Sequence, residues 1–496
     1  MDYPFGQFAP DAGELAPGVM MDVSGVLPLR DGYGPLKGWY FPNTGSSGIF
    51  PGTLVKGMVS LRLRDGTRVV YAGSDTDWHK LNADWTWGSG LGGGTFNVTS
   101  GDYWSFLHFG NYLLGTNTTD GMQAYNVETP AGISYVSAAG DPRQIFSCGN
   151  VVVGLDCKDD SGNRDNRLIR NSAINDHTNW TTRGADIQPL EDGGALIVGR
   201  DITGNAAFIG QENAIRIMQF GDAPGGALYS LYKAVDGVGP VSANATVVLG
   251  RTCFFPTLDG FARYTFGAAE VDRIGAGRID RWWLNRVDQT RLGLMQAAVD
   301  PENKVIWWVY PDQTYYTPSL EGLMAEVIGY HWQLDKWTRY TLPIYVMGQI
   351  STPGYTLEDM DAFGPLDSIN TPLDDRFWQG SAPLFLAIGL GKLPMLLSGP
   401  NMLAQFTTGT VNSAQSMLVR SATPVTDGPM TVALGVKDKL SDTLTWKPAV
   451  ATQPSGRAPL WGRGKNVAFN GEIAASSDWT YATGIDHVEL STGGPR

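Results

Sequence analysis

Between residues 291 and 342 the chain contains four short, mostly apolar and aromatic segments separated by polar stretches. The segments are Met295–Val299, Lys304–Tyr310, Val327–Gln333 and Trp337–Leu342. They are rich in β-branched and aromatic residues, which favours strands. The turn at residues 300–303 is Asp-Pro-Glu-Asn, in which Pro presets φ and Asp and Asn bond their own backbone. The pattern predicts a four-stranded antiparallel meander, the size of one propeller blade.

A polar turn followed by an apolar run recurs along the rest of the chain. The turns are Asp65-Gly66, Gly110-Asn111, Gly149-Asn150, Gly204-Asn205, Gly250-Arg251 and Gly391-Lys392. All but the last are spaced by roughly 40 to 55 residues, as in propeller repeats. We therefore predict an all-β fold with a six- or seven-bladed β-propeller over residues 54–408. A series of unrelated β-hairpins is the alternative.

A second recurring feature is a polar turn residue followed by Trp. It occurs at Asp77-Trp78, Asn179-Trp180, Lys336-Trp337 and Asp478-Trp479. An aromatic ring in this place is suited to fastening the end of a strand to its neighbour, so we expect these rings to be buried.

The segments outside the repeats suggest three parts. Residues 1–53 are rich in Pro and Gly and predict an extended N-terminal arm laid over the body. Residues 349–380 are acidic and Pro-rich, an acidic insertion within the propeller, and Asp156–Arg170 resembles a projecting polar loop. Residues 409–496 alternate again and predict a small C-terminal β-sandwich or partial barrel. The best helical candidate, Val271–Val287, is short.

Composition and charge limit the function. Gly accounts for 63 of 496 residues and charged residues for only 17%, as in all-β proteins with many turns. The net charge of −13 argues against tight binding to a phosphate backbone. The three cysteines form no Cys-x-x-Cys pair, which predicts free, buried thiols in a reducing compartment. The N-terminus lacks a signal-peptide pattern, and the most apolar stretch, Ala382–Leu397, is too short to span a bilayer.

No motif commits the chain to catalysis. The five histidines, at 79, 108, 177, 331 and 487, lack metal-ligand spacing and are expected in turns or at the surface. The carboxylates Glu358, Asp359, Asp361, Asp374 and Asp375 could act as a glycosidase pair or hold calcium, but a solvated acidic loop is favoured. The segments Ser74–Trp78 and Gly462–Lys465 are expected to be turns. We predict no enzyme activity, no cofactor and no metal, and the sequence identifies no catalytic or binding residue.

Seven pieces, in their order along nearly the whole chain, resemble the packaged-DNA stabilisation proteins, or tail hubs, of short-tailed bacteriophages. They are Val26–Tyr33, Trp104–Asn111, Arg170–Asp176 with Trp180, Gly237–Ser242, Leu258–Phe261 with Arg273–Gly275, Ala297–Pro301 with Trp307 and Tyr310, and Trp479–Ile485. The acidic segment at 349–380 has no counterpart in this resemblance.

The resemblance implies a structural virion protein of the tail, assembled in the host cytoplasm as a ring, most simply a homo-hexamer. Its partners would be the portal or head-to-tail adaptor and the tail needle, nozzle or fibre proteins. Genomic DNA would pass without tight binding, helped by an acidic wall, and no membrane is involved. The alternative is a glycan-binding or glycan-degrading propeller protein of a tail, in which Trp-rich turns stack sugars.

Overall fold

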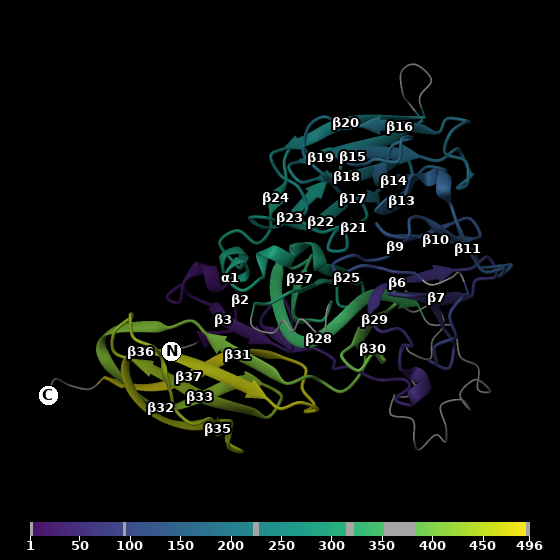
Figure 1. The fold of residues 1–496 in the computed structure, drawn as a ribbon. Helices are drawn as coiled ribbons and strands as arrows, with labels where there is room; N and C mark the ends of the chain where they lie inside the picture. The colour runs from purple at the N-terminus through teal and green to yellow at the C-terminus, as the bar shows by residue number, and fades with distance from the viewer. Residues whose placement is uncertain (1–2, 93–95, 222–227, 314–321, 352–382, 493–496) are drawn as a thin grey trace.

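The computed structural model describes residues 3–92, 96–221, 228–313, 322–351 and 383–492. Within these residues the chain forms a ring of six sheets and one curled sheet of twelve strands, which lies at the lower left of Figure 1. The predicted all-β fold, a propeller with a C-terminal β domain, is confirmed, and the propeller has six blades.

The first five sheets of the ring are antiparallel and follow one another along the chain. They are β6 (Val55–Arg62), β7 (Arg68–Ser74) and β8 (Trp78–Leu81); β9 (Ser105–Phe109), β10 (Tyr112–Thr116), β11 (Gln123–Asn126) and β12 (Ile133–Tyr135); β13 (Gln144–Cys148), β14 (Val151–Lys158), β15 (Arg164–Asn171) and β16 (Asp186–Pro189); β17 (Leu196–Asp201), β18 (Ala206–Gln211), β19 (Ala214–Phe220) and β20 (Tyr229–Asp236); and β21 (Val247–Leu249), β22 (Thr252–Thr257), β23 (Gly260–Thr265) and β24 (Asp272–Arg273). A short 3-10 turn, η3 (Ser137–Ala139), lies between the second and third sheets.

The sixth sheet contains the predicted meander and extends beyond it. Its strands are β25 (Gln296–Asp300), β26 (Val305–Tyr310), β27 (Met324–His331), β28 (Lys336–Ser351), β29 (Pro383–Gly389) and β30 (Pro394–Leu396). β28 has 16 residues, and it pairs with β27 through its first half and with β29 through its second. Because β28 also contacts both β25 and β6, its second half closes the ring between the last sheet and the first.

The recurring polar turns join the first and second strands of the first five sheets. Gly66, Gly110, Gly149, Gly204 and Gly250 all have φ between 58° and 90° there, a conformation that costs glycine little. In the sixth sheet Lys304 takes the same place with φ of 56°. Gly391-Lys392 differs, because it joins β29 to β30 and not a first strand to a second.

Apolar cores lie between neighbouring sheets around the ring. One cluster joins the third and fourth sheets through Phe146, Val153 and Ile209, and another joins the fourth and fifth through Phe208 and Phe255. Each sheet buries both faces, so nearly every position of its second strand is apolar. This explains why those runs show weak alternation in the sequence.

The twelve-stranded sheet takes strands from both ends of the chain. From the N-terminus come β1 (Tyr3–Pro4), β2 (Gln7–Phe8), β3 (Val19–Ser24), β4 (Val26–Pro28) and β5 (Tyr33–Pro35); from the C-terminal part come β31 (Ala404–Thr408), β32 (Val411–Thr426), β33 (Met430–Lys437), β34 (Thr445–Trp446), β35 (Val450–Ala451), β36 (Ala458–Ile473) and β37 (Ala482–Thr492). Two 3-10 turns, η1 (Pro10–Ala12) and η2 (Ser46–Gly48), also belong to the N-terminal segment. The sheet curls on itself, so of the two predicted forms it is the partial barrel.

Three details of the predicted organisation are corrected. The N-terminal segment does not simply lie over the body, because its strands pair with β31 and β37. Residues 404–408, assigned to the propeller, are β31 and pair with β3 and β36, so the propeller ends at β30. Asp156–Arg170 is no projecting loop, since it belongs to the β14–β15 hairpin, in which arginine side chains fold back onto backbone carbonyls. Most of the acidic segment, from residue 352 on, lies outside the described residues.

The four Trp residues that follow a polar turn residue are all buried, as expected. Trp78 and Trp337 are fully enclosed, and Trp180 and Trp479 are 3% and 2% exposed. The expected turn at Ser74–Trp78 also forms, because the Ser74 hydroxyl accepts from the amides of Thr76 and Asp77.

The helical candidate contains one short helix, α1 (Asp280–Leu284), beside the fifth sheet; η5 (Gln289–Leu294) follows it. Asp280 is 8% exposed, and its Oδ1 accepts from the backbone N–H of Phe261 at 3.1 Å. Its carboxyl fills the space above Gly260 and Gly275, where a Cβ on either residue would clash with it. Leu258–Phe261 and Arg273–Gly275, two of the segments that resemble the tail-hub family, therefore both pack against this carboxyl.

Asp280 makes the stability of the fold depend on pH. Burial, reinforced by the nearby Asp11, raises the pKa of Asp280 to about 6 from an ordinary value of 3.8. Between pH 4 and 6 the folded protein therefore holds a proton that the unfolded chain has lost, so stability falls as pH rises through that window. We expect Asp280→Asn, which keeps the acceptor oxygen, to raise the free energy of unfolding by about 2 kcal/mol at pH 7.5 and not at pH 4. Denaturant titrations at the two pH values measure this, with the exposed Asp31→Asn as a control expected to change neither; an equal gain at both would contradict the account.

Candidate functional site: the axis of the propeller

The end of the ring at which the first strands begin surrounds a small cavity of about 190 Å³, the mouth cavity. Segments preceding or beginning β9, β13, β17, β21 and β25 contribute to its wall, and its charged lining residues are Asp102, Arg143 and Asp156. In a propeller these segments converge on the axis, which makes this face the natural place to look for a ligand.

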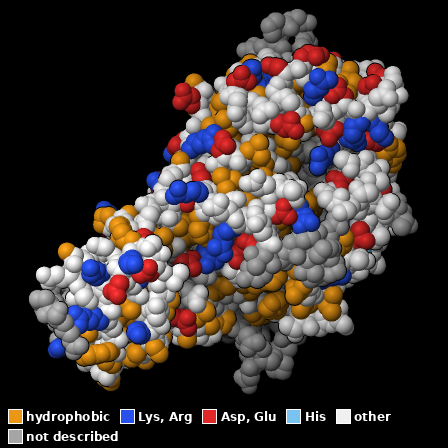
Figure 2. Space-filling model, turned by 60° about the vertical axis from the view of Figure 1, so that its left-hand side comes forward, with side chains coloured by type: hydrophobic (Ala, Val, Ile, Leu, Met, Phe, Trp, Pro, Cys, Tyr) orange, Lys and Arg blue, Asp and Glu red, His pale blue; other side chains and the backbone are white. Residues whose placement is uncertain are grey.

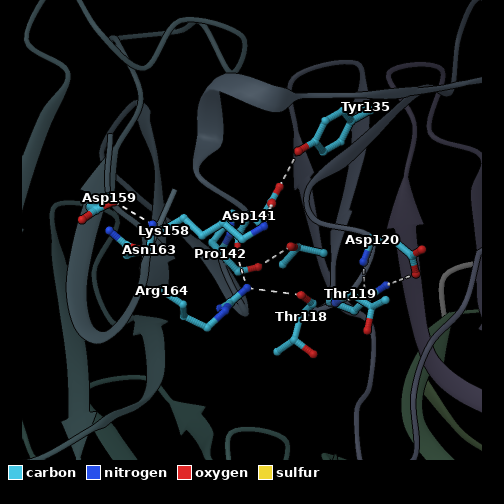
Figure 3. A network of polar contacts seen from close by, with 12 residues as sticks. Thr118, Thr119, Asp120, Tyr135, Asp141, Pro142, Lys158, Asp159, Asn163 and Arg164 are labelled. Atoms are coloured by element: carbon cyan, nitrogen blue, oxygen red, sulfur yellow. Dashed lines mark hydrogen bonds and ion pairs between the residues drawn. The ribbon is translucent and has the colours of Figure 1, made fainter. Parts of the chain in front are cut away.

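A polar network lies beside the mouth cavity and joins the second sheet to the third (Figure 3). Asp141 is at its centre, 8% exposed; it accepts from the Tyr135 hydroxyl at 2.6 Å and from Lys158 Nζ at 2.6 Å. Arg164 donates to the backbone oxygens of Asp141 at 2.8 Å and Asp156 at 2.6 Å. Figure 3 shows Tyr135, from β12 of the second sheet, pointing at Asp141, in the segment before β13.

The same network reaches the mouth cavity through Thr118. The Arg164 guanidinium donates to the Thr118 carbonyl at 3.3 Å, and the Thr118 backbone N–H and hydroxyl both donate to Asp102, the N–H at 2.8 Å. Asp141 and Asp156 have φ of 46° and 53°, a conformation that is uncommon for side chains other than Asn and Asp. Asp156 also sits at the register shift between β14 and β15, which turns its side chain toward Arg164.

The network is built for support rather than for proton transfer. Asp141, Asp156 and Asp102 all accept hydrogen bonds or pair with cations, so none of them is an unengaged base. Burial and the bond to Asp141 raise the pKa of Tyr135 to about 12, which keeps it a neutral hydrogen-bond donor at physiological pH. The arrangement connects two neighbouring blades through side-chain hydrogen bonds. Sequence reasoning missed it because Asp156–Arg170 resembled a loop, although the alternating charges of this segment are also compatible with a hairpin.

A second cavity of about 400 Å³, the axial cavity, is bounded by β6, β17, β21, β25 and β28. Arg200 is the one charged residue in its lining. Its guanidinium donates to the backbone oxygens of Ala243 at 2.7 Å, Thr246 at 3.2 Å and Gly199 at 3.2 Å. Nothing in the local sequence of Arg200 marks it, because its surroundings come from segments up to about 150 residues away.

The histidines were expected in turns or at the surface. His177 does lie in a turn, although it is buried, and its ring is 4.2 Å from that of Tyr112. His79 and His331 instead lie buried in strands, where each ring makes a polar contact: His79 Nδ1 lies 3.3 Å from the Gly88 carbonyl oxygen, and His331 Nδ1 accepts from Leu334 N–H at 3.1 Å. Among the described residues, no group of His, Cys, Asp and Glu is placed to hold a metal ion.

The three cysteines are free and buried, as predicted. Burial raises the pKa of all three thiols to about 12, so they are protonated and poorly nucleophilic at neutral pH.

The expected turn at Gly462–Lys465 does not form, because these residues lie within β36. No helix in the described part of the chain is long and apolar enough to cross a membrane.

Comparison with known proteins gives no family. No family model matches the sequence, and no curated protein matches it. Similar solved structures include the extracellular domain of a hybrid two-component system from B. thetaiotaomicron (9% identity, TM-score 0.40, 77% of this chain), the computationally designed protein Ika8 (8%, 0.34, 69%) and the mitotic checkpoint complex (10%, 0.41, 74%). The matches cover 41%, 82% and 94% of those chains respectively, so this chain spans less than half of the first. Likeness at this level says nothing about function.

Proposed function

We propose that this chain is a structural subunit of a short-tailed phage tail hub, which forms a ring that joins the portal or adaptor to the tail and through which DNA passes. The observation that carries the proposal is the order of the seven sequence pieces that resemble this family. The positions of some pieces in the fold support it, because they lie at joints between structural parts; other pieces contribute residues to the mouth and axial cavities.

Two of these joints illustrate the point. Val26–Tyr33 contains β4 and the start of β5, and it docks on β28: Thr338 donates to the Val26 carbonyl, and Lys336 Nζ to the Leu29 carbonyl at 2.7 Å. At the other end of the chain, Trp479 is buried against Phe406, with ring centroids 6.2 Å apart. A protein that must transmit force between neighbours in a virion depends on such joints, whereas an enzyme depends on a reactive site.

Charge is distributed unevenly between the parts of the chain. Residues 409–496 contain eight Lys and Arg against seven Asp and Glu, whereas the remainder contains 28 against 42. On β36 the outward residues Pro459, Trp461, Arg463 and Lys465 form an exposed row, and Trp461 is 70% exposed. Figure 2 shows Lys and Arg side chains spread over the visible face of this domain, at the lower left.

This row, which we call the β36 face, is suited to the acidic surface of the next copy in a ring. A head-to-tail contact between unlike surfaces closes into a ring when its rotation does, and opposite charges favour that pairing. The N-terminal strands, in contrast, are engaged within their own subunit and are not available to a neighbour in this form.

The assembly is tested by native mass spectrometry and single-particle images of the purified protein over a range of salt concentrations. We expect closed rings of six copies at low salt, and expect Arg463→Glu with Lys465→Glu to shift them to monomers. Arg251→Glu, an exposed charge reversal on the propeller, is the matched control and should leave the rings intact. The proposal is contradicted if the wild-type chain is monomeric at all concentrations. It is also contradicted if the wild-type protein binds duplex DNA and the double variant loses this binding but still forms rings.

The glycan-binding alternative loses its original support in the structure. It relied on Trp at turns as platforms for sugars, and those four rings are buried. A glycan array, together with hydrolysis assays on host envelope polysaccharide, separates the two functions. If the chain is a tail-hub subunit, we expect no saturable binding of glycans and no cleavage of the polysaccharide.

A further inference from the structure

Arg200 is a half-buried cation whose guanidinium has no carboxylate partner among the described residues. It projects from β17 into the axial cavity, and its three hydrogen-bond acceptors are all neutral carbonyl oxygens. No carboxylate in the described part of the chain forms an ion pair with it, and no Asp or Glu belongs to the cavity lining. The other arginine of the same sheet's core, Arg216, is bonded to Asp192 in the usual way.

Removing part of the water around a charge in this manner costs free energy unless something compensates for it. Burial lowers the pKa of Arg200 to about 10, the direction expected for a cation that has lost water without gaining a counter-ion. The guanidinium has five N–H groups, and its three hydrogen bonds to carbonyl oxygens use three of them. Arg200 lines the cavity, and a planar guanidinium is well suited to the oxygens of a carboxylate or a phosphate.

The surroundings of Arg200 offer further neutral donors. Asn244 lines the same cavity and lies next to Ala243, whose carbonyl already accepts from Arg200. Gln296, from β25, is also in the lining, and its amide nitrogen donates to the Tyr345 carbonyl at 2.9 Å, which holds this side chain in place. The combination of one cation with side-chain amides and no carboxylate is the chemistry of an anion site.

We propose that the axial cavity binds a small oxyanion, a carboxylate or phosphate group, through Arg200 and Asn244. The inference is independent of the hub proposal, because it concerns the interior of a single propeller. An anion in this place would bond to β17 and to the segment before β21, and would thereby stabilise the ring of blades from its centre.

The probes are sodium phosphate and sodium acetate, each titrated against the purified full-length protein at ionic strength held constant with sodium chloride. The readout is the melting temperature, with calorimetric titration for the dissociation constant. For the wild-type protein we expect a saturable rise in melting temperature with at least one probe. Phosphate alone would indicate a phosphate-bearing ligand, and acetate alone a carboxylate.

Three variants test the role of Arg200. Arg200→Gln is expected to weaken binding at least about tenfold, the loss of one charge-assisted bidentate contact. Arg200→Lys keeps the charge without the planar fork and should bind with intermediate affinity. Arg420→Gln, which removes an exposed arginine from β32, is the control and should bind as the wild type does.

Asn244→Asp provides a test that does not require removal of Arg200. It places a carboxylate in the same cavity lining as the guanidinium, so we expect a higher melting temperature without added anion and no further rise with it. The proposal is overturned if chloride alone reproduces the effect, if Arg200→Gln responds as the wild type does, or if Asn244→Asp lowers the melting temperature.

Discussion

Trp337→Ala is expected to lower the free energy of unfolding by roughly 3–5 kcal/mol, the range for deleting a large buried aromatic side chain. The ring is fully buried at the start of β28, with its Nε1 donating to the Ile274 carbonyl at 3.3 Å. Its centroid lies 4.8 Å from that of Tyr330 and 5.1 Å from that of Phe261. It therefore joins the sixth sheet to the fifth, and its loss leaves a cavity between two blades that cannot easily collapse.

Denaturant unfolding followed by Trp fluorescence and far-UV circular dichroism measures the change. Leu258→Ala is the control, since Leu258 lies on the propeller, away from the β36 face, and is 67% exposed, so its removal should cost less than about 0.5 kcal/mol. Equal losses for the two variants would mean that the turn-associated Trp residues do not hold the blades together.

The propeller could be predicted because its signals are local. Each of the first five sheets begins with a hairpin whose turn requires positive φ, and glycine at positions such as Gly110 and Gly149 reports that requirement directly. The first two strands of the meander were predicted to within one residue, because Asp300–Asn303 is a turn with its own local hydrogen bonds. The other two were placed less well: β27 begins three residues before the predicted segment, and β28 continues nine residues past it.

The parts that could not be predicted depend on contacts between distant segments. Tyr3 faces Ile485 in the same sheet, and nothing in the sequence of residues 1–53 states that their strands complete a C-terminal sheet. Ala404–Thr408 was assigned to the propeller because it is strand-like, and only its partners, β3 and β36, show where it belongs. Arg200 was not noticed for the same reason, since an arginine in a strand is ordinary until its surroundings are known.

A second large effect is expected where the N-terminal strands meet the propeller. Arg339 of β28 bonds Asp22 of β3 through Nε and one terminal nitrogen, both at 2.7 Å. Its other terminal nitrogen lies 3.4 Å from Glu326, whose side chain is 3% exposed. Burial raises the pKa of Glu326, and the positive charge of Arg339 opposes that rise. The arginine therefore reduces the free-energy cost of holding this carboxylate in the interior.

Arg339→Met should therefore cost about 3–5 kcal/mol of unfolding free energy at pH 7.5, the usual result of leaving one member of a buried pair alone. Most of this loss comes from Glu326, so the double variant Arg339→Met with Glu326→Gln should recover at least half of it. Asp22→Asn should cost only about 1 kcal/mol, because Asp22 is 44% exposed and its charge is partly solvated.

The pH dependence of the single variant gives an independent measurement. Without Arg339 the pKa of Glu326 in the folded protein rises further above its unfolded value of 4.5. The folded state then holds a proton that the unfolded chain lacks, so the deficit of Arg339→Met relative to the wild type should be smaller at pH 5 than at pH 8. The account is contradicted if the deficit of Arg339→Met does not change with pH, if Glu326→Gln does not relieve it, and if Asp22→Asn loses as much stability. The unfolding free energy lost in Arg339→Met would then come from the contact with Asp22 of β3, and Glu326 would have no part in joining the propeller to the twelve-stranded sheet.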